Sequence, residues 1–363
     1  MLTGSGTGII GSFLMRSRDV LLRLGTGNQG RYVNVDYTIA LPKKTLTRAA
    51  MLTLTTQSRF QKRRYRFLFI FFLTLFTSFD TPPEDFHPTT LTGGVFDVRA
   101  NEEIKRFMAT ASDSVLTILN GNLWMLPGGL SIDKEERIDR FISYARQLMP
   151  HVITLQEVWT MDLVAYLESR FPEFHVVASG QGGSVNTAGL VTLSRVPSDS
   201  TAFSAFPVAQ GASLLEKQAR KGYLTVHLEM PTFKASIINT HLYSPTCEQD
   251  QAFVAHQFNT LKQIDTSGYT FIVGDLNLAQ QAFERLNDSF FLTEQDTSYT
   301  VDPTNKYRSR GSNSIRAKKV DSYKVDRLLM PQAHGEHFSL KSMLIRDPIV
   351  SDHYLLAYRI ERH

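Results

Sequence analysis

The sequence of 363 residues contains a single cysteine, Cys247. One thiol excludes an intrachain disulfide and any zinc site that is built from several cysteines, and it leaves the redox compartment open. The chain also has no internal repeat and no low-complexity tract. A hydrophobic content of 42% and a charged content of 20% indicate a globular protein. At this length the chain can form a large domain plus an appendage.

Acidic residues are scarce in the first part of the chain. Residues 1–79 contain 12 lysines and arginines against 2 acidic residues, whereas residues 80–363 contain 27 basic and 33 acidic residues. The formal net charge of +4 therefore arises from the N-terminal segment. Because the remainder is mildly acidic, the charge distribution argues against an extended track for nucleic acid.

The chain lacks an apolar run long enough for a comfortable membrane span, which requires about 20 residues. Its longest such run, residues 67–79, has 13 apolar or small hydroxyl residues and follows the basic segment 61–66. This order is typical of a secretory signal. We therefore predict that residues 51–79 are a signal-like or membrane-anchor segment and that the protein is secreted or membrane-associated. The alternative is a buried helix or strand.

The position of this run, about 60 residues into the chain, leaves two interpretations of residues 1–50. If translation starts at Met51, residues 1–50 lie outside the protein; otherwise they form a separate leader. Residues 80–111, which include a Thr-Pro-Pro segment, are predicted to be a linker. Residues 112–363 are predicted to form the main folded domain of the chain.

The pattern from about residue 95 onward is that of an α/β domain. The apolar positions 138, 141, 142, 145 and 148 have helical spacing after a cap at Ser131 or Asp133, and a second helix is predicted near residues 251–263. The predicted strands are short and numerous, covering residues 115–119, 152–155, 190–193, 224–228, 235–238, 271–273, 325–330 and 354–359. Many strands with few helices predict two packed sheets with helices outside.

Two polar residues near the ends of the first strands are candidate metal ligands. Glu157 follows the apolar strand 152–155, and a carboxylate at a strand end suits magnesium, which binds oxygen ligands. Taken alone, such a glutamate is usually a solvated rim residue. Asn122 would place a carboxamide beside it, although an asparagine next to Gly121 is equally typical of a turn.

The Gly-Asp-Leu-Asn motif at 274–277 follows the apolar strand 271–273. Strand alternation places Asp275 and Asn277 on one face, where they could position a phosphate and a water. The alternative is a turn with local side-chain hydrogen bonds.

Two histidines follow later strands and are candidates for acid–base chemistry. His241 closes the strand at 235–240, and His353 follows Asp352. A general base needs an imidazole held in one tautomer, which a carboxylate such as that of Asp326 can provide. A single histidine is more often structural, so the joint occurrence of these elements supports catalysis.

These motifs resemble those of the endonuclease/exonuclease/phosphatase superfamily, which includes deoxyribonuclease-I-like nucleases, inositol polyphosphate phosphatases and neutral sphingomyelinases. The resemblance covers roughly residues 112–361. It implies an α/β, four-layer sandwich of two packed mixed β-sheets flanked by helices, and a divalent-metal-dependent phosphoesterase. The residues that carry it are, in chain order, Asn122, Gln156-Glu157, Asn239-Thr240-His241, Gly274-Asp275-x-Asn277, Asp326 and Ser351-Asp352-His353.

The resemblance also implies roles for these residues. Glu157 would bind the metal with Asn122 nearby, and the metal would be Mg²⁺, with Mn²⁺ or Ca²⁺ as alternatives. His353 would be the base, oriented by Asp326. The remaining catalytic residues would position the nucleophile and leaving group, stabilise the phosphorane charge, or accompany the base; they are Asp275, Asn277, His241 and Asp352.

The motifs are most similar to those of the neutral-sphingomyelinase branch, which predicts a phosphodiesterase acting on a membrane phospholipid. Lys221, in a Lys-Gly-Tyr motif, would contact a phosphate or simply form a turn. A nuclease is a competing hypothesis because residues 308–319 are rich in arginine and lysine. The motifs are also compatible with an inositol or sugar phosphatase and with a catalytically silent binding module.

Overall fold

The chain divides into two units, residues 1–70 and 71–363, and of the first unit the computed structural model describes residues 15–17, 20–29, 32–40 and 52–56. In the first unit, the strands β1 (Met15–Ser17), β2 (Val20–Gln29), β3 (Tyr32–Ala40) and β4 (Leu52–Thr56) form an antiparallel sheet in that order. Three of these strands lie within the segment that we considered a leader. The second unit is described for residues 99–109, 112–127, 131–180, 183–208, 211–245, 247–266, 268–310 and 322–363.

The predicted signal-like segment lies outside the described residues except for β4, and so does the apolar run 67–79. Among the residues that are described, no helix has the length and apolar character needed to cross a membrane.

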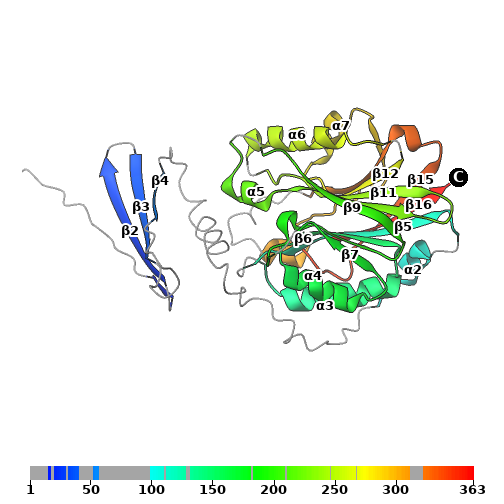
Figure 1. Cartoon of the computed structure of the whole chain (residues 1–363), viewed down its shortest axis with the longest axis horizontal. Coiled ribbons are helices and arrows are strands. Elements are labelled where there is room, and N and C mark those ends of the chain that lie inside the picture. The colour runs from blue at the N-terminus through cyan, green and yellow to red at the C-terminus, as the bar shows by residue number, and fades with distance from the viewer. Residues whose placement is uncertain are drawn as a thin grey trace, which may run out of the picture. The chain divides into compact units, whose positions relative to one another are not determined.

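The second unit contains two six-stranded mixed sheets (Figure 1). The first sheet has the order β15-β16-β5-β6-β8-β7, and the second has the order β13-β14-β12-β11-β10-β9. Each sheet has one parallel pair, β5–β6 in the first and β11–β12 in the second. The first sheet comprises β5 (Val115–Met125), β6 (Val152–Val158), β7 (His175–Ala178), β8 (Val191–Ser194), β15 (Phe338–Ile345) and β16 (Leu355–Arg362). The second comprises β9 (Ser198–Ala205), β10 (Gly222–Glu229), β11 (Lys234–His241), β12 (Tyr269–Asp275), β13 (Phe291–Thr293) and β14 (Asp326–Pro331).

Helices cover the outer faces of both sheets, which gives four layers (Figure 1). The first sheet packs against α2 (Glu102–Met108), α3 (Lys134–Leu148) and α4 (Met161–Arg170). The second packs against α6 (Gln251–Leu261) and α7 (Gln280–Asn287). Two shorter helices, α5 (Leu214–Ala219) and α8 (Lys306–Arg310), lie in connecting segments. The predicted four-layer sandwich is confirmed.

Helix α2 lies inside the segment 80–111 that we predicted to be a linker. Asn101 begins it, because its side chain accepts a hydrogen bond from Glu103 N. Ile104 and Met108, four residues apart, are buried in the core that α3 shares with the first sheet. The domain therefore starts before residue 112, and a helix of two turns was too short to show a clear period in the sequence.

The core between the two sheets explains how polar residues reach one place. Along each central strand every second residue points into this core, as Leu116 and Ile118 do on β5 and Phe271 and Val273 do on β12. The same alternation carried past the last apolar residue places polar side chains at one end of the inter-sheet space. These side chains are Asn120 and Asn122 on β5, Gln156 on β6, Asn239 and His241 on β11, and Asp275 on β12.

Candidate active site

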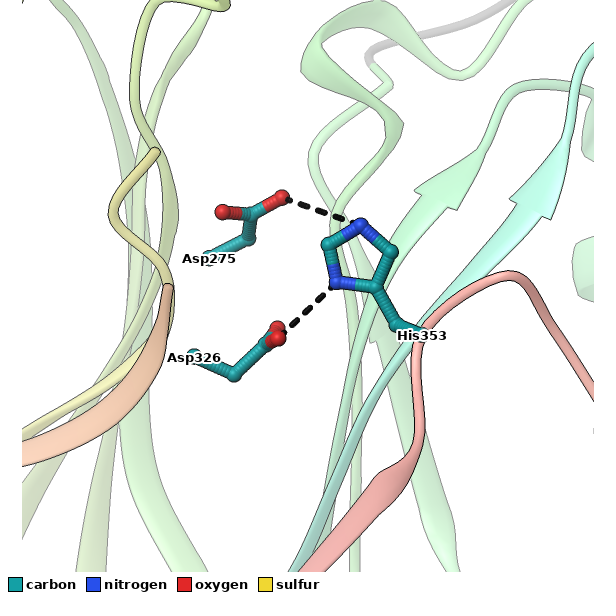
Figure 2. A group of neighbouring side chains, drawn as sticks. All are labelled: Asp275, Asp326 and His353. Atoms are coloured by element: carbon teal, nitrogen blue, oxygen red, sulfur yellow. Dashed lines mark hydrogen bonds and ion pairs between the residues drawn. The ribbon is translucent and has the colours of Figure 1, made fainter. Parts of the chain in front are cut away.

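His353 and Asp326 form a hydrogen-bonded pair between the two sheets (Figure 2). His353 precedes β16 of the first sheet, whereas Asp326 begins β14 of the second. The His353 Nδ1 atom lies 2.8 Å from Asp326 Oδ2, and the Nε2 atom lies 3.9 Å from Asp275 Oδ2. The carboxylate of Asp326 therefore fixes the proton on Nδ1 and leaves Nε2 facing Asp275.

The neighbouring carboxylates set the charge state of His353. Burial alone would lower its pKa, but the charge and hydrogen bond of Asp326, together with the charges of Asp275 and Asp352, raise the pKa to about 10. The ring is thus an imidazolium near neutral pH as long as only these carboxylates surround it. Additional positive charge in the cluster would favour the neutral form that a base requires.

Thr300 connects the two partners of this pair, although nothing in the sequence singled it out. Its hydroxyl accepts hydrogen bonds from Asp326 N at 3.3 Å and Val325 N at 3.2 Å. Its carbonyl accepts a hydrogen bond from Tyr354 N at 2.8 Å, next to His353. Thr300 is fully buried and therefore fixes the spacing between β14 and the segment that carries the base.

The Gly-Asp-Leu-Asn motif combines the two interpretations that the sequence left open. Asp275 Oδ1 accepts a hydrogen bond from Asn277 N at 2.8 Å, which is a local turn, while Oδ2 faces the site. The Asn277 side chain donates to Leu242 O at 3.0 Å. Gly274 has φ +149°, and a Cβ atom there would lie 1.9 Å from Thr240 O on β11. Glycine is required because β11 and β12 approach so closely beside the catalytic residues.

Asn122 lies between two carboxylates of the site. Its Nδ2 atom donates to Glu157 Oε1 and to Asp275 Oδ2, both at 3.1 Å, and its Oδ1 atom accepts from Trp124 N at 3.0 Å. These three partners fix the orientation of the amide. The strand β5 extends to Met125, so Asn122 lies within the strand and not in a turn after it. Its predicted role as a metal ligand stays a prediction, because its oxygen would have to serve Trp124 N as well.

Glu157 reaches the site through a local departure from regular strand geometry. It lies within β6, where alternation would direct it to the same side as Leu155, but its φ of +58° turns the side chain toward Asn122. Burial raises the pKa of Glu157, and the charge of Asp352 raises it further, while the Asn122 hydrogen bond lowers it. Among the described residues, its buried Oε2 atom has no hydrogen-bond partner.

His241 is a neutral histidine at the end of β11. Burial lowers its pKa, and the nearby Lys221 ammonium lowers it further, to about 3. Lys221 is itself buried: its Nζ atom lies 2.8 Å from Leu242 O, 3.2 Å from His241 Nε2 and 3.3 Å from Glu216 Oε1. An ammonium only donates, so Nε2 accepts and the His241 proton is on Nδ1. Lys221 is thus neither a simple turn residue nor free in a cleft.

Asp352 faces the start of the basic segment 308–319. Its Oδ2 atom lies 3.3 Å from Arg308 Nη1. Of this segment, only the α8 residues 308–310 belong to the described part of the chain. Asp352 also accepts from Ser351 Oγ at 3.3 Å and raises the pKa of both Glu157 and His353. It therefore acts on the site through its charge.

Arg137, on the first turn of α3, holds the main chain on two sides of the site through hydrogen bonds. Nothing in the sequence indicated this role, because Arg137 falls within a helical pattern. It is fully buried. Its guanidinium donates to main-chain carbonyls on both sides of the site, at 2.7 Å to Leu123 and 3.0 Å to Val350. Further bonds reach Trp124 O, Ile132 O and Ser131 Oγ. One side chain thereby joins the end of β5 to the segment that carries His353.

Three residues of the site, Asp275, Asp326 and His353, lie within 4.8 Å of one another through potential ligand atoms. Their closeness has another explanation, since His353 and Asp326 share a hydrogen bond of 2.8 Å. Glu157 fits a cation better, because its buried carboxylate oxygen lacks any partner in the described structure and oxygen is the donor that hard divalent cations prefer.

The hydrogen-bonded histidine–aspartate pair and the buried carboxylates lie together at one end of the two-sheet sandwich, an arrangement that can activate a water for attack on a phosphate ester. The model of the Endonuclease/Exonuclease/phosphatase family matches residues 121–353, from the residue before Asn122 to His353 itself. The chain belongs to this family.

Comparison with individual proteins gives one curated relative and several solved structures. The chain is 30% identical over 183 residues to the inositol phosphosphingolipids phospholipase C of Saccharomyces cerevisiae, a match that spans 46% of this chain and 35% of the relative. The structure of SmcL is similar with a TM-score of 0.58 and 17% identity, over 69% of this chain and 100% of that one. Sphingomyelinase C from Streptomyces griseocarneus has a TM-score of 0.55 and 16% identity, over 68% and 99%.

A nucleic-acid enzyme is among the similar structures as well. TDP2 of D. rerio, in complex with a single-strand DNA product, has a TM-score of 0.54 and 18% identity, over 68% of this chain and 99% of that one. At these identities the structural likeness establishes the fold and not the substrate.

Proposed function

We propose that the protein is a divalent-metal-dependent phosphodiesterase that hydrolyses the head-group phosphodiester of a phosphosphingolipid. The observation that carries this proposal is the hydrogen bond between His353 and Asp326, which leaves Nε2 of His353 facing Asp275. The substrate class is supported by the curated relative, a phospholipase C for inositol phosphosphingolipids, and by the similarity of the motifs to those of neutral sphingomyelinases. We also propose that the protein is secreted or membrane-associated, in keeping with the basic and apolar segment 61–79.

The residues have distinct roles in the proposed reaction. His353 takes a proton from water through Nε2 as the water oxygen bonds to phosphorus, and Asp326 stabilises the imidazolium that forms. The ester bond to the leaving alcohol breaks, and the alcohol oxygen takes up a proton. Asp275 and Asn277 position water and leaving group, and His241 stabilises the charge that develops on the phosphate. Asp352 contributes through its charge on the site.

A divalent cation fits this site at Glu157, with Asn122 as the neighbouring residue. The site contains four carboxylates, those of Glu157, Asp275, Asp326 and Asp352. They would repel an anionic phosphodiester without added positive charge. When bound, the cation supplies that charge and polarises the phosphate ester. We propose Mg²⁺, with Mn²⁺ and Ca²⁺ as alternatives that oxygen ligands also accept.

The metal assignment is tested by Glu157→Gln, which removes the charge and keeps the shape of the side chain. Loss of a direct ligand should weaken apparent metal affinity by at least about tenfold, since even outer partners of metal ligands contribute about 10- to 100-fold. The measurements are a metal titration of activity and calorimetric Mn²⁺ binding, with the surface variant Glu229→Gln as the control. An unchanged titration would remove Glu157 from the metal site.

The substrate is tested by a panel assayed with and without EDTA. Vesicles containing sphingomyelin or inositol phosphosphingolipid should release the phosphorylated head group only when a divalent cation is present. Release of inorganic phosphate from inositol or sugar phosphates would identify a phosphatase. No activity on any substrate of the panel, with or without the cation, would favour a catalytically silent binding module.

A nuclease is the second candidate function, favoured by the position of Arg308 beside Asp352 at the site. An arginine there could contact a nucleic-acid backbone together with the rest of the basic segment. The mildly acidic balance of residues 80–363 argues against it. Cleavage of plasmid or single-stranded DNA, with no head-group release from vesicles, would reverse this ranking.

A further inference from the structure

Two aliphatic side chains next to the site are exposed without any function assigned to them. Val208 is 62% exposed and Leu214 is 50% exposed. Across the described part of the chain, only two other large hydrophobic side chains, Phe290 and Tyr299, are exposed to a similar degree. Two of the four thus lie within seven residues, which makes chance scatter a poor explanation.

Two basic side chains share this surface. Lys217 and Arg220 are exposed, and no ion pair involves either of them among the described residues. Lys217 lies three residues after Leu214 on α5, so both project from the same face of the helix. The acidic Glu216 between them turns inward to Lys221 and has a side-chain exposure of 14%. Because residues 80–363 are acidic overall, this local basic and apolar surface is an exception.

The surface is continuous with the catalytic residues. Phe206 N donates to Lys221 O at 2.9 Å, which ties the segment carrying Val208 to the lysine that contacts His241. Ser244 N donates to Glu216 Oε1 at 3.2 Å, which ties α5 to the segment just after His241. Val208, Lys217 and Arg220 also line one depression together with Lys221.

The depression itself is too small for a ligand. Its volume of about 20 Å³ has room for about one water molecule. A head group or a peptide side chain could not enter it. The surface is therefore suited to contact with a broad partner and not to insertion of a small one.

We propose that this surface, which we call the α5 rim and define as Val208, Leu214, Lys217 and Arg220, docks on a lipid bilayer that contains anionic lipids. The aliphatic side chains enter the interfacial region and the two cations contact lipid head groups. Docking places His241 and the rest of the site against the head groups of the substrate. The α5 rim would bring the active site to its lipid substrate, so this inference rests on the proposed phospholipid hydrolysis.

The single cysteine of the chain allows a direct test. Cys247 is exposed, so the test protein carries Cys247→Ser and the label then reacts at a single engineered site. That site is Val208→Cys, which is labelled with an environment-sensitive fluorophore. The full chain also carries His353→Ala to stop turnover. On vesicles of phosphatidylcholine and phosphatidylserine, we expect blue-shifted emission and quenching by lipids with spin-labelled acyl chains. The matched control carries the same label at Phe290, another exposed hydrophobic position, and should show neither response.

A charge variant tests the role of the two cations. Lys217→Gln with Arg220→Gln should lower the fraction of inserted label at position 208 by roughly tenfold or more, since each cation near an anionic surface contributes about fivefold. Vesicles of phosphatidylcholine alone should give a weak response with either protein. Because the label reports local contact, attachment through the N-terminal segment does not mimic it.

Several results would overturn the inference. Equal responses at positions 208 and 290, or no effect of the charge variant, would remove the α5 rim as a docking surface. A response that grows with protein concentration without vesicles would identify a second copy of the chain as the partner. If the parent chain hydrolyses the lipid while the label at position 208 of the His353→Ala variant stays in water, the α5 rim is refuted and the proposed function is intact. If the label inserts but the parent chain hydrolyses no lipid, the α5 rim holds as a docking surface and the proposed function is refuted.

Discussion

The second sheet supplies His241 and Asp275 by continuing the side-chain alternation of its core strands, whereas the first sheet supplies Glu157 from a residue that breaks this alternation. On β11 and β12, alternation from the core leads directly to His241 and Asp275. On β6, Glu157 itself adopts a left-handed conformation, which turns its side chain toward the site, and the register between β5 and β6 shifts next to it. The second sheet therefore provides a rigid platform, and the first provides a set of side chains that depends on neighbouring braces.

The largest effect is expected where the two sheets meet, at the pair of His353 and Asp326. His353→Ala should lower kcat by about 10²- to 10⁴-fold, the usual contribution of a general base. Folding should be preserved, as checked by circular dichroism and thermal unfolding. The exposed His175→Ala serves as the control and should keep full turnover. Activity of His353→Ala close to that of the parent would exclude it as the base.

Gly274→Ala tests the rigidity of the second sheet. A Cβ at this position would lie 1.9 Å from Thr240 O, and main chain cannot move away without separating β11 from β12. We expect a loss of about 3 kcal/mol or more in the free energy of unfolding, measured by urea denaturation. Gly268→Ala, where an added Cβ meets nothing within 4 Å, is the matched control. A small effect at Gly274 would show that the platform is more adaptable than its geometry implies.

Arg137→Lys tests whether the first sheet depends on its brace. A lysine keeps the charge but cannot reach the five oxygen acceptors of the guanidinium, so buried carbonyls lose partners and stability should fall by about 2 kcal/mol. Because Val350 is released, kcat should fall as well while apparent metal affinity changes little. Arg140→Lys, in a surface ion pair with Glu136, is the control. Loss of stability without loss of kcat would make the brace purely structural.

His151 lies just before β6 and contacts the start of β5, at the end of these two strands opposite to Asn122. It accepts a hydrogen bond from Thr117 N at 3.1 Å, and burial, followed by the charges of Arg195 and Arg359, lowers its pKa to about 4. Because the neutral ring is favoured in the folded state, the folded state binds fewer protons than the unfolded state between pH 6.5 and 4. The contribution of His151 to the free energy of unfolding is therefore complete above about pH 6.5 and is lost as the pH falls toward 4. His151→Gln should reduce the acid sensitivity of unfolding in that window, compared with the surface variant His227→Gln.

The comparison of the two sheets also explains what the sequence could predict. Alternation after an apolar run was enough to place Asp275 at the end of a strand, and the many strands with few helices predicted two packed sheets with helices outside. The four-layer class itself followed from the resemblance of the motifs. It could not predict that Glu157 adopts a positive φ, since that conformation depends on the neighbouring strand register. The strand-end position made Glu157 a candidate, and the resemblance of the motif added its role as a metal ligand.

Residues that act through tertiary contacts were outside the reach of the sequence pattern. Arg137 sits in a helical series and Thr300 in an irregular segment, and neither shows a motif of its own. The charge of His353 likewise depends on carboxylates from three separate segments, Asp275, Asp326 and Asp352, which no local pattern brings together. The roles of the site residues stay predictions until the variants are measured.

The central position of β16 in the first sheet has a consequence for synthesis of the chain. This strand, Leu355–Arg362, pairs with β5 at Leu356–Asn120 through Glu361–Val115 and also with β15. During synthesis, β5 therefore has one unpaired edge until residues 355–362 have been made, an arrangement prone to aggregation. Removal of β16 would split the sheet instead of trimming its border.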